Sequence, residues 1–153
     1  MKKILLIATL ITTTVVAMTQ TRVSSPKSPK EILNDRYASG LFKNAEGTVF
    51  DIDNENVQSY FNILDWLEGR VAGLQVVVSR NGGRVPVIRG SAATIYVDEM
   101  RMDASFLNSL SVNDIGMIKV IKGPFVGAIG NGGGGTIAIY TIRAEEEFDL
   151  DSD

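Results

Sequence analysis

Five short apolar runs, each bordered by glycine or by turn-forming residues, follow one another between Asn62 and Ile142. In order they read ILDWLEGRVAGLQVVVS, VPVIRG, ATIYVDEM, IGMIKVIKGP and GGGGTIAIYT. Runs of this length that are rich in Val, Ile and Tyr are typical of strands, and the glycines permit the turns between them. The series therefore predicts one small domain built around a sheet.

The first run begins with a predicted helix. Asn62 suits the N-cap position, and Asp65 stands three residues further on, at the acidic position of a capping box. Apolar side chains recur at helical spacing from there, at Leu64, Leu67, Val71 and Leu74. Gly73 suits the left-handed conformation that often ends a helix.

The later runs predict strands. Residues 74–79 and 85–90 flank turn-forming residues and should form a hairpin. Further elements are expected as strands at 93–98, 117–121 and 136–142, a short helix at about 103–110, and a helical or turn segment at 125–129. In the strand at 117–121 the apolar residues alternate around Lys119. The predicted fold class is α+β, with a small mixed sheet of four or five strands and two or three short helices.

The first 19 residues have the three parts of a secretory signal peptide. Lys2 and Lys3 form a basic start, residues 4–16 are mostly apolar, and small residues follow at 17–19. A membrane anchor is the alternative, but this apolar stretch is shorter than the roughly 20 residues that span a bilayer. We expect cleavage after Ala17 or Thr19 and export of the rest of the chain.

Composition divides the remaining chain. Residues 20–55 are expected to be a flexible leader and a weakly structured segment, with one short strand after Gly47. Residues 56–143 form the predicted domain, and residues 144–153 are expected to be an acidic, disordered tail. Without Lys2 and Lys3, 13 basic residues remain against 18 acidic ones, which argues against nucleic acid as a partner.

The residue types disfavour an enzyme. The chain has no His and no Cys, so it lacks the commonest general base, the thiol nucleophile and the usual zinc ligands. Asp98, Glu99 and Asp103 cluster in sequence, but an acid at a strand end and an acid at a helix start are more simply turn and cap residues. We expect no catalytic residue and no cofactor.

Two loops resemble ligand-binding motifs but lack key residues. Asp51, Asp53 and Glu55 have the alternate spacing of a calcium loop, yet Asn56 stands at its glycine position and Asn62 at its bidentate glutamate position. We expect no metal site there. The run NGGGGT at 131–136 lacks the lysine of a phosphate-binding loop and precedes a strand instead of a helix. We interpret its glycines as a tight connection with positive φ and close backbone approach.

Arginines and aromatic residues leave two further alternatives. Four arginines are scattered along the chain, at Arg70, Arg84, Arg89 and Arg101. They could form an anion site, but scattered arginines more often form ion pairs. Trp66 stands near Tyr60 and Phe61, and these three residues suggest either a docking patch or core packing. The helical spacing of Trp66 with Leu67 favours the core.

The spaced phrases together resemble the plug domain of TonB-dependent outer-membrane receptors. In that family a helix ends in a Leu-x-Gly-x-x-x-Gly-Leu phrase, an Ile-Arg-Gly phrase follows, a strand closes in Asp-Gly, and Ile-Glu-Val-Leu-Lys-Gly and Gly-Gly-x-Ile-x-Ile-x-Thr phrases complete the order. The resemblance assigns the structural motif to Leu67, Gly69, Gly73, Leu74, Ile88, Arg89, Gly90, Asp98, Val120, Gly123, Gly134, Gly135 and Thr141. The wording GRVAGLQV and IAIYT is most similar to plug-bearing proteins of the Bacteroidetes group, including the SusC-like class.

Two residues depart from the family pattern. Glu99 stands where the family has the glycine of Asp-Gly, which predicts a different turn after Asp98. Lys119 stands where the family has an acid, which reverses a charge on one strand face. The resemblance transfers no substrate-binding residue, because those loops vary.

The resemblance implies an exported, non-enzymatic protein of the periplasm or outer membrane of a Gram-negative bacterium. Its implied partners are an outer-membrane β-barrel and a protein of the TonB system, with oligomeric state left open. A 22-stranded barrel needs several hundred further residues, roughly ten for each strand plus loops, so none is expected here. We identify no TonB box in residues 20–30. The alternatives are a periplasmic glycan- or protein-binding module and a remnant of a larger receptor gene.

Overall fold

A computed structural model describes residues 25–80, 82–123 and 133–142. In this part of the chain two α-helices, two 3₁₀ helices and eight strands alternate along the sequence. They are α2 (Pro29–Tyr37), β1 (Thr48–Asp51), α3 (Ile63–Glu68), β2 (Leu74–Val78), β3 (Arg84–Ile88), β4 (Ser91–Ala92), β5 (Thr94–Val97), β6 (Met100–Met102), η1 (Ala104–Asn108), η2 (Val112–Asp114), β7 (Ile115–Ile121) and β8 (Thr136–Thr141). The α+β class predicted from the sequence is confirmed.

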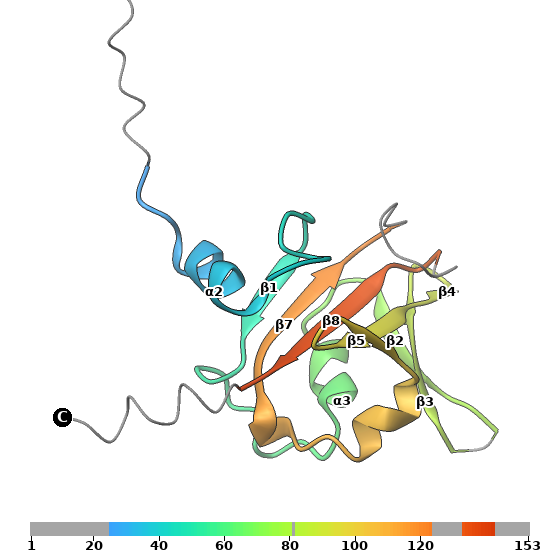
Figure 1. Cartoon of the computed structure of the whole chain (residues 1–153). Coiled ribbons are helices and arrows are strands. Elements are labelled where there is room, and N and C mark those ends of the chain that lie inside the picture. The colour runs from blue at the N-terminus through green and yellow to red at the C-terminus, as the bar shows by residue number, and fades with distance from the viewer. Residues whose placement is uncertain (1–24, 81, 124–132, 143–153) are drawn as a thin grey trace, which may run out of the picture.

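The main sheet has five strands in the order β1-β7-β8-β5-β6. Only β5 and β8 are parallel among its neighbouring pairs, and the other pairs are antiparallel. In Figure 1, β7 and β8 cross the middle of the molecule, with α2 and β1 at one side and the smaller sheet at the other. The last two runs of the sequence, β7 and β8, therefore form the centre of the fold.

A second sheet contains β2, β3 and β4. The predicted hairpin of the first two strand-like runs is confirmed as the antiparallel pair β2 and β3. The outer edge of β2 is partly occupied, because the backbone amide of Val76 donates to the Glu68 carboxylate at 2.7 Å. A side chain bound along a free edge limits pairing with other strands. The sequence pattern alone did not separate these strands from the main sheet.

The central strands of the main sheet, β7 and β8, are buried on both faces. In β8, Ile137 and Ile139 pack into the core shared with α3, whereas Ala138 and Tyr140 pack on the opposite face. This alternation follows from the two-residue period of a strand. A register shift in β7 between Ile115 and Met117 inserts Gly116 as an extra residue. The bulge explains why Ile115 and Met117, two positions apart, pack on opposite faces.

Residues 28–45, which we call the cover, lie on the second face of the main sheet. Ser28 caps α2 in a capping box with Glu31, and Pro29 occupies the first helical turn. Tyr37, Ala38 and Phe42 are the buried apolar side chains of the cover. The short strand predicted after Gly47 is present as β1, whereas the cover lies where the sequence predicted a leader and weakly structured segment. The order of the cover depends on contacts with β7, far away in the sequence, and local patterns carry little information on such contacts.

The helices differ from the predictions at their ends. Asn62 caps α3 as predicted and accepts from the amide of Leu64 at 2.9 Å. The helix then ends at Glu68, with Gly69 as its C-cap, and the left-handed Gly73 comes later, just before β2. The predicted helix at 103–110 is a 3₁₀ helix capped by Asp103. Hydrogen bonds from the amide and hydroxyl of Ser105 lower the pKa of the Asp103 carboxyl.

Several predictions fall outside the described residues. They are the signal peptide at 1–19, most of the glycine-rich connection with the segment 125–129, and the acidic tail. Within the residues that are described, no helix is both long and apolar enough to cross a membrane.

Candidate functional site: the motif residues and the cover contacts

Two motif phrases form tight two-residue hairpin turns. Arg89 and Gly90 connect β3 to β4 with φ of 52° and 82°. Asp98 and Glu99 connect β5 to β6 with φ of 47° and 66°. Positive φ at both central residues is what a type I′ hairpin requires. At Glu99, where the family phrase has glycine, a non-glycine residue therefore adopts the left-handed conformation that glycine would take at lower cost.

The Asp98 turn is joined to the end of β8. The Asp98 carboxylate accepts from the Thr141 amide at 3.0 Å and from the Thr141 hydroxyl at 2.8 Å. These two motif residues come from neighbouring parallel strands, β5 and β8. The pair fixes the point where the two strands leave the sheet.

We expect Asp98→Ala to lower the free energy of unfolding by about 1 kcal/mol, because two exposed hydrogen bonds are lost and alanine disfavours positive φ. Asp98→Asn is the matched control, since asparagine tolerates this conformation and keeps one acceptor oxygen. Urea unfolding should rank the stabilities as wild type, then Asp98→Asn, then Asp98→Ala. Equal midpoints for all three proteins would contradict a role for the Thr141 contact.

Gly134 and Gly135 permit close backbone packing before β8. A Cβ on Gly134 would lie 2.0 Å from the carbonyl oxygen of Ser91. A Cβ on Gly135 would lie 2.2 Å from the carbonyl oxygen of Ile121, and Gly135 has φ of 107°. The interpretation as a tight connection therefore fits both residues, although positive φ applies to Gly135 alone.

The remaining motif residues serve the core or its turns. The side chains of Leu67, Leu74, Ile88 and Val120 are buried in the core shared with α3. Gly73 and Gly123 have positive φ, of 82° and 114°. Gly69 has open space where a Cβ would lie and ordinary helical φ, so nothing in the structure explains its glycine.

Trp66 is a core residue. Its side chain is 0% exposed, contacts Phe50 edge to face at 5.6 Å and carries the Arg70 guanidinium 4.2 Å above its ring. Phe61 is 81% exposed, so the three neighbouring aromatic residues do not form one docking patch. The core interpretation of Trp66 is confirmed.

The charged candidates lie apart or bind locally. Arg84 pairs with Asp65 at 3.0 Å, whereas Arg89 lies at the opposite end of β3. The Asp51 carboxylate accepts from the Asn54 side chain at 2.8 Å. Across residues 25–80, 82–123 and 133–142, no group of three His, Cys, Asp or Glu side chains could hold a metal ion.

Lys119 is the most unusual charged residue of the sheet. It lies in the middle of β7 and is 3% exposed, although its place in the sequence resembles that of an outward-facing residue. Its ammonium donates to Asn34 Oδ1 at 2.7 Å, to the Phe42 carbonyl at 2.7 Å and to the Lys43 carbonyl at 3.3 Å. All three acceptors belong to the cover. Burial lowers the pKa of Lys119 below its ordinary value.

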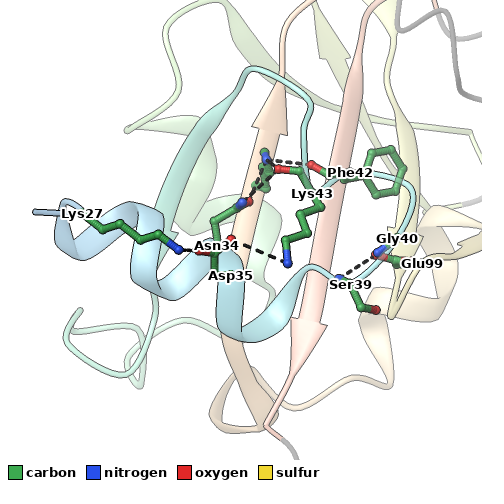
Figure 2. A network of polar contacts seen from close by, with 9 residues as sticks. Lys27, Asn34, Asp35, Ser39, Gly40, Phe42, Lys43 and Glu99 are labelled. Atoms are coloured by element: carbon green, nitrogen blue, oxygen red, sulfur yellow. Dashed lines mark hydrogen bonds and ion pairs between the residues drawn. The ribbon is translucent and has the colours of Figure 1, made fainter. Parts of the chain in front are cut away.

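Glu99, in the turn between β5 and β6, binds the part of the cover that follows α2. Its carboxylate accepts from the backbone amides of Ser39, Gly40 and Leu41 at 3.2, 2.8 and 3.2 Å. Figure 2 shows Glu99 beside Ser39 and Gly40, while Asn34 and Asp35 lie on α2 on the other side of the network. The two departures from the family phrases, Lys119 and Glu99, thus bind the same segment. Sequence reasoning noted both residues but missed their common partner.

Comparison with known proteins agrees with this fold. A family model described as the TonB-dependent Receptor Plug Domain matches residues 42–137. No curated protein sequence matches the chain significantly.

Three solved structures are similar. The siderophore receptor PirA from Acinetobacter baumannii is 22% identical with a TM-score of 0.52, and the match covers 70% of this chain and 19% of that chain. A mutant of the ferric enterobactin receptor PfeA from Pseudomonas aeruginosa, in complex with enterobactin, is 20% identical with a TM-score of 0.52, covering 64% and 18%. The RagAB peptide importer in its open-open state is 22% identical with a TM-score of 0.50, covering 64% and 12%. The match spans less than a fifth of each of these proteins, and at these identities it concerns the fold.

Proposed function

Since the chain belongs to the TonB-dependent receptor plug domain family, we propose that it acts in outer-membrane transport as a plug that docks with or gates a separately encoded β-barrel. The observation that carries this proposal is the family match from Phe42 to Ile137, which begins within the cover and ends within β8. Plug domains belong to transporters and receptors, which are not enzymes. We propose a protein of the TonB system as a second partner.

The location follows from the same family. Plug domains occur in outer-membrane receptors of Gram-negative bacteria, and this supports an envelope location. We propose that residues 1–19 direct export and are then removed, and that the chain belongs to the SusC-like class of the Bacteroidetes group. The sequence phrases of α3 with β2, and of β8, support membership of the SusC-like class. Mass measurement of the N-terminus of the exported chain would test the removal of residues 1–19.

The docking proposal predicts that an affinity-tagged chain, cross-linked in the source bacterium, is recovered from the outer-membrane fraction together with a β-barrel protein. The control is the same chain carrying Gly135→Val, which should be strongly destabilised and so recover less of the barrel. Recovery of the wild-type chain in the cytoplasm would contradict the proposal. A folded wild-type chain that binds a glycan library and enriches no barrel would favour a periplasmic binding module instead.

A further inference from the structure

The cover buries little apolar surface for its length. Of the nine residues of α2, only Tyr37 is buried. Ile32 is 56% exposed, and Leu41 is exposed to a lesser degree. Because burial of apolar surface is the main stabilising term in folding, the apolar contribution of the cover comes mainly from Tyr37 and Phe42.

Hydrogen bonds with two charged residues of the main sheet also hold the cover in place. Lys119 from β7 donates to oxygen atoms of the cover, and Glu99 from the β5–β6 turn accepts from its backbone amides. All of these partners lie between Asn34 and Lys43. One charged group donates and the other accepts, so together they bind carbonyl and amide groups of one short segment. Hydrogen bonds to charged groups are the stronger kind.

Contacts within the cover make it one unit. The Asn34 side chain donates to the Lys43 carbonyl at 2.9 Å, and Asp35 pairs with Lys27 and, at 3.7 Å, with Lys43. Figure 2 shows that these residues link α2 to the segment after it. The helix and the following turn are therefore connected to each other as well as to the sheet.

The sheet also leaves room for one aromatic ring of the cover. A Cβ on Gly116 would lie 2.3 Å from the hydroxyl oxygen of Tyr37, so the bulge residue of β7 must lack a side chain where Tyr37 packs. Beneath the cover, the sheet face carries Tyr96, Met117 and Tyr140, which are all buried. The hydroxyl of Tyr96 is buried and has no hydrogen-bond partner.

We propose that the cover is a releasable strap, which opens as one unit while both sheets stay folded and so exposes the face with Tyr96, Met117 and Tyr140. Lys119 and Glu99 are its two fastening residues. This inference concerns the domain by itself and goes beyond the proposed function, since it holds whichever barrel the domain meets.

Hydrogen exchange of the full chain, read by mass spectrometry on peptic fragments or by NMR, tests the strap. Wild type is compared with Glu99→Gln and Lys119→Met, each of which weakens one fastening. Each variant should speed exchange about tenfold across the whole cover, including the Ala38 amide at the end of α2 and the Ala45 amide in the turn, because opening is shared. In each protein the β7 and β8 amides should stay more protected than the cover amides, because they exchange only when the whole domain unfolds.

The matched control is Glu68→Gln. Glu68 is also a carboxylate that accepts a backbone amide, but it binds Val76 in the second sheet. This variant should leave exchange of the cover unchanged. The proposal is overturned if Glu99→Gln speeds only the amides that it binds, if cover and sheet amides of wild type share one opening free energy, or if neither variant changes the cover. Because Glu99→Gln keeps an acceptor oxygen, it tests the strap even if Lys119→Met fails to fold.

Discussion

Gly135→Val should strongly destabilise the domain. The new Cβ would lie 2.2 Å from the Ile121 carbonyl oxygen, and the residue would keep φ near 107°, which a β-branched side chain does not tolerate. Relief requires β8 to move away from β7 or β5, where the Gly135 carbonyl accepts from the Thr94 amide at 2.9 Å. We expect a loss of about 3–5 kcal/mol in the free energy of unfolding, against the 5–15 kcal/mol typical of a small domain.

Circular dichroism during urea unfolding measures this loss. Gly82→Val is the matched control, because Gly82 also has a positive φ, of 76°, but no atom lies within 4 Å of the position that a Cβ would take there. The control therefore contains backbone strain without the clash and should lose only about 1–2 kcal/mol. Equal losses at the two positions would mean that close backbone approach at Gly135 is not the reason for its glycine.

Local chemistry explains which parts of the fold could be predicted. The Asn62 cap, the hairpin of β2 and β3 and the strands from β5 to β8 each depend on residues near one another in the sequence. Turn chemistry likewise placed Asp98 and Asp103, although it did not reveal the left-handed conformation of Glu99. The helix α3 ends at Glu68, before the left-handed Gly73 at which the sequence pattern placed its end.

The cover contacts could not be predicted in the same way. Lys119 lies 85 residues from Asn34, and Glu99 lies 60 residues from Ser39. A lysine between apolar residues in a strand is normally an outward-facing residue, and nothing in its neighbours indicates a second layer above it. Only the tertiary structure brings the polar backbone of the cover over the sheet and turns two unexpected charges into fastening residues.

The charged side chain of Lys119 forms hydrogen bonds to the cover, but its burial also lowers the stability of the folded state. Burial lowers its pKa, so the folded state holds the proton less tightly than the unfolded state, whose lysine titrates near 10.5. The charged form therefore reduces stability below the folded pKa, and this penalty fades as the pH rises toward 10.5. The three acceptor oxygens offset only part of it. Lys119→Met removes both the buried charge and its hydrogen bonds, so we expect it to lower the free energy of unfolding by only about 1–2 kcal/mol.

Lys119→Glu should have a much larger effect, because it places an acceptor against the oxygen atoms of Asn34, Phe42 and Lys43. The buried carboxylate would have no donor, so we expect a loss of about 3–5 kcal/mol and detachment of the cover. Limited trypsin digestion reads the detachment directly, since the backbone after Arg36 and Lys43 can enter the protease only when the cover leaves the sheet. Lys122→Glu is the matched control, with the same change of charge at a half-buried residue just past the end of β7. If Lys119→Glu unfolds and is cleaved no faster than Lys122→Glu, the ammonium does not fasten the cover, and the bonds drawn to it contribute nothing measurable.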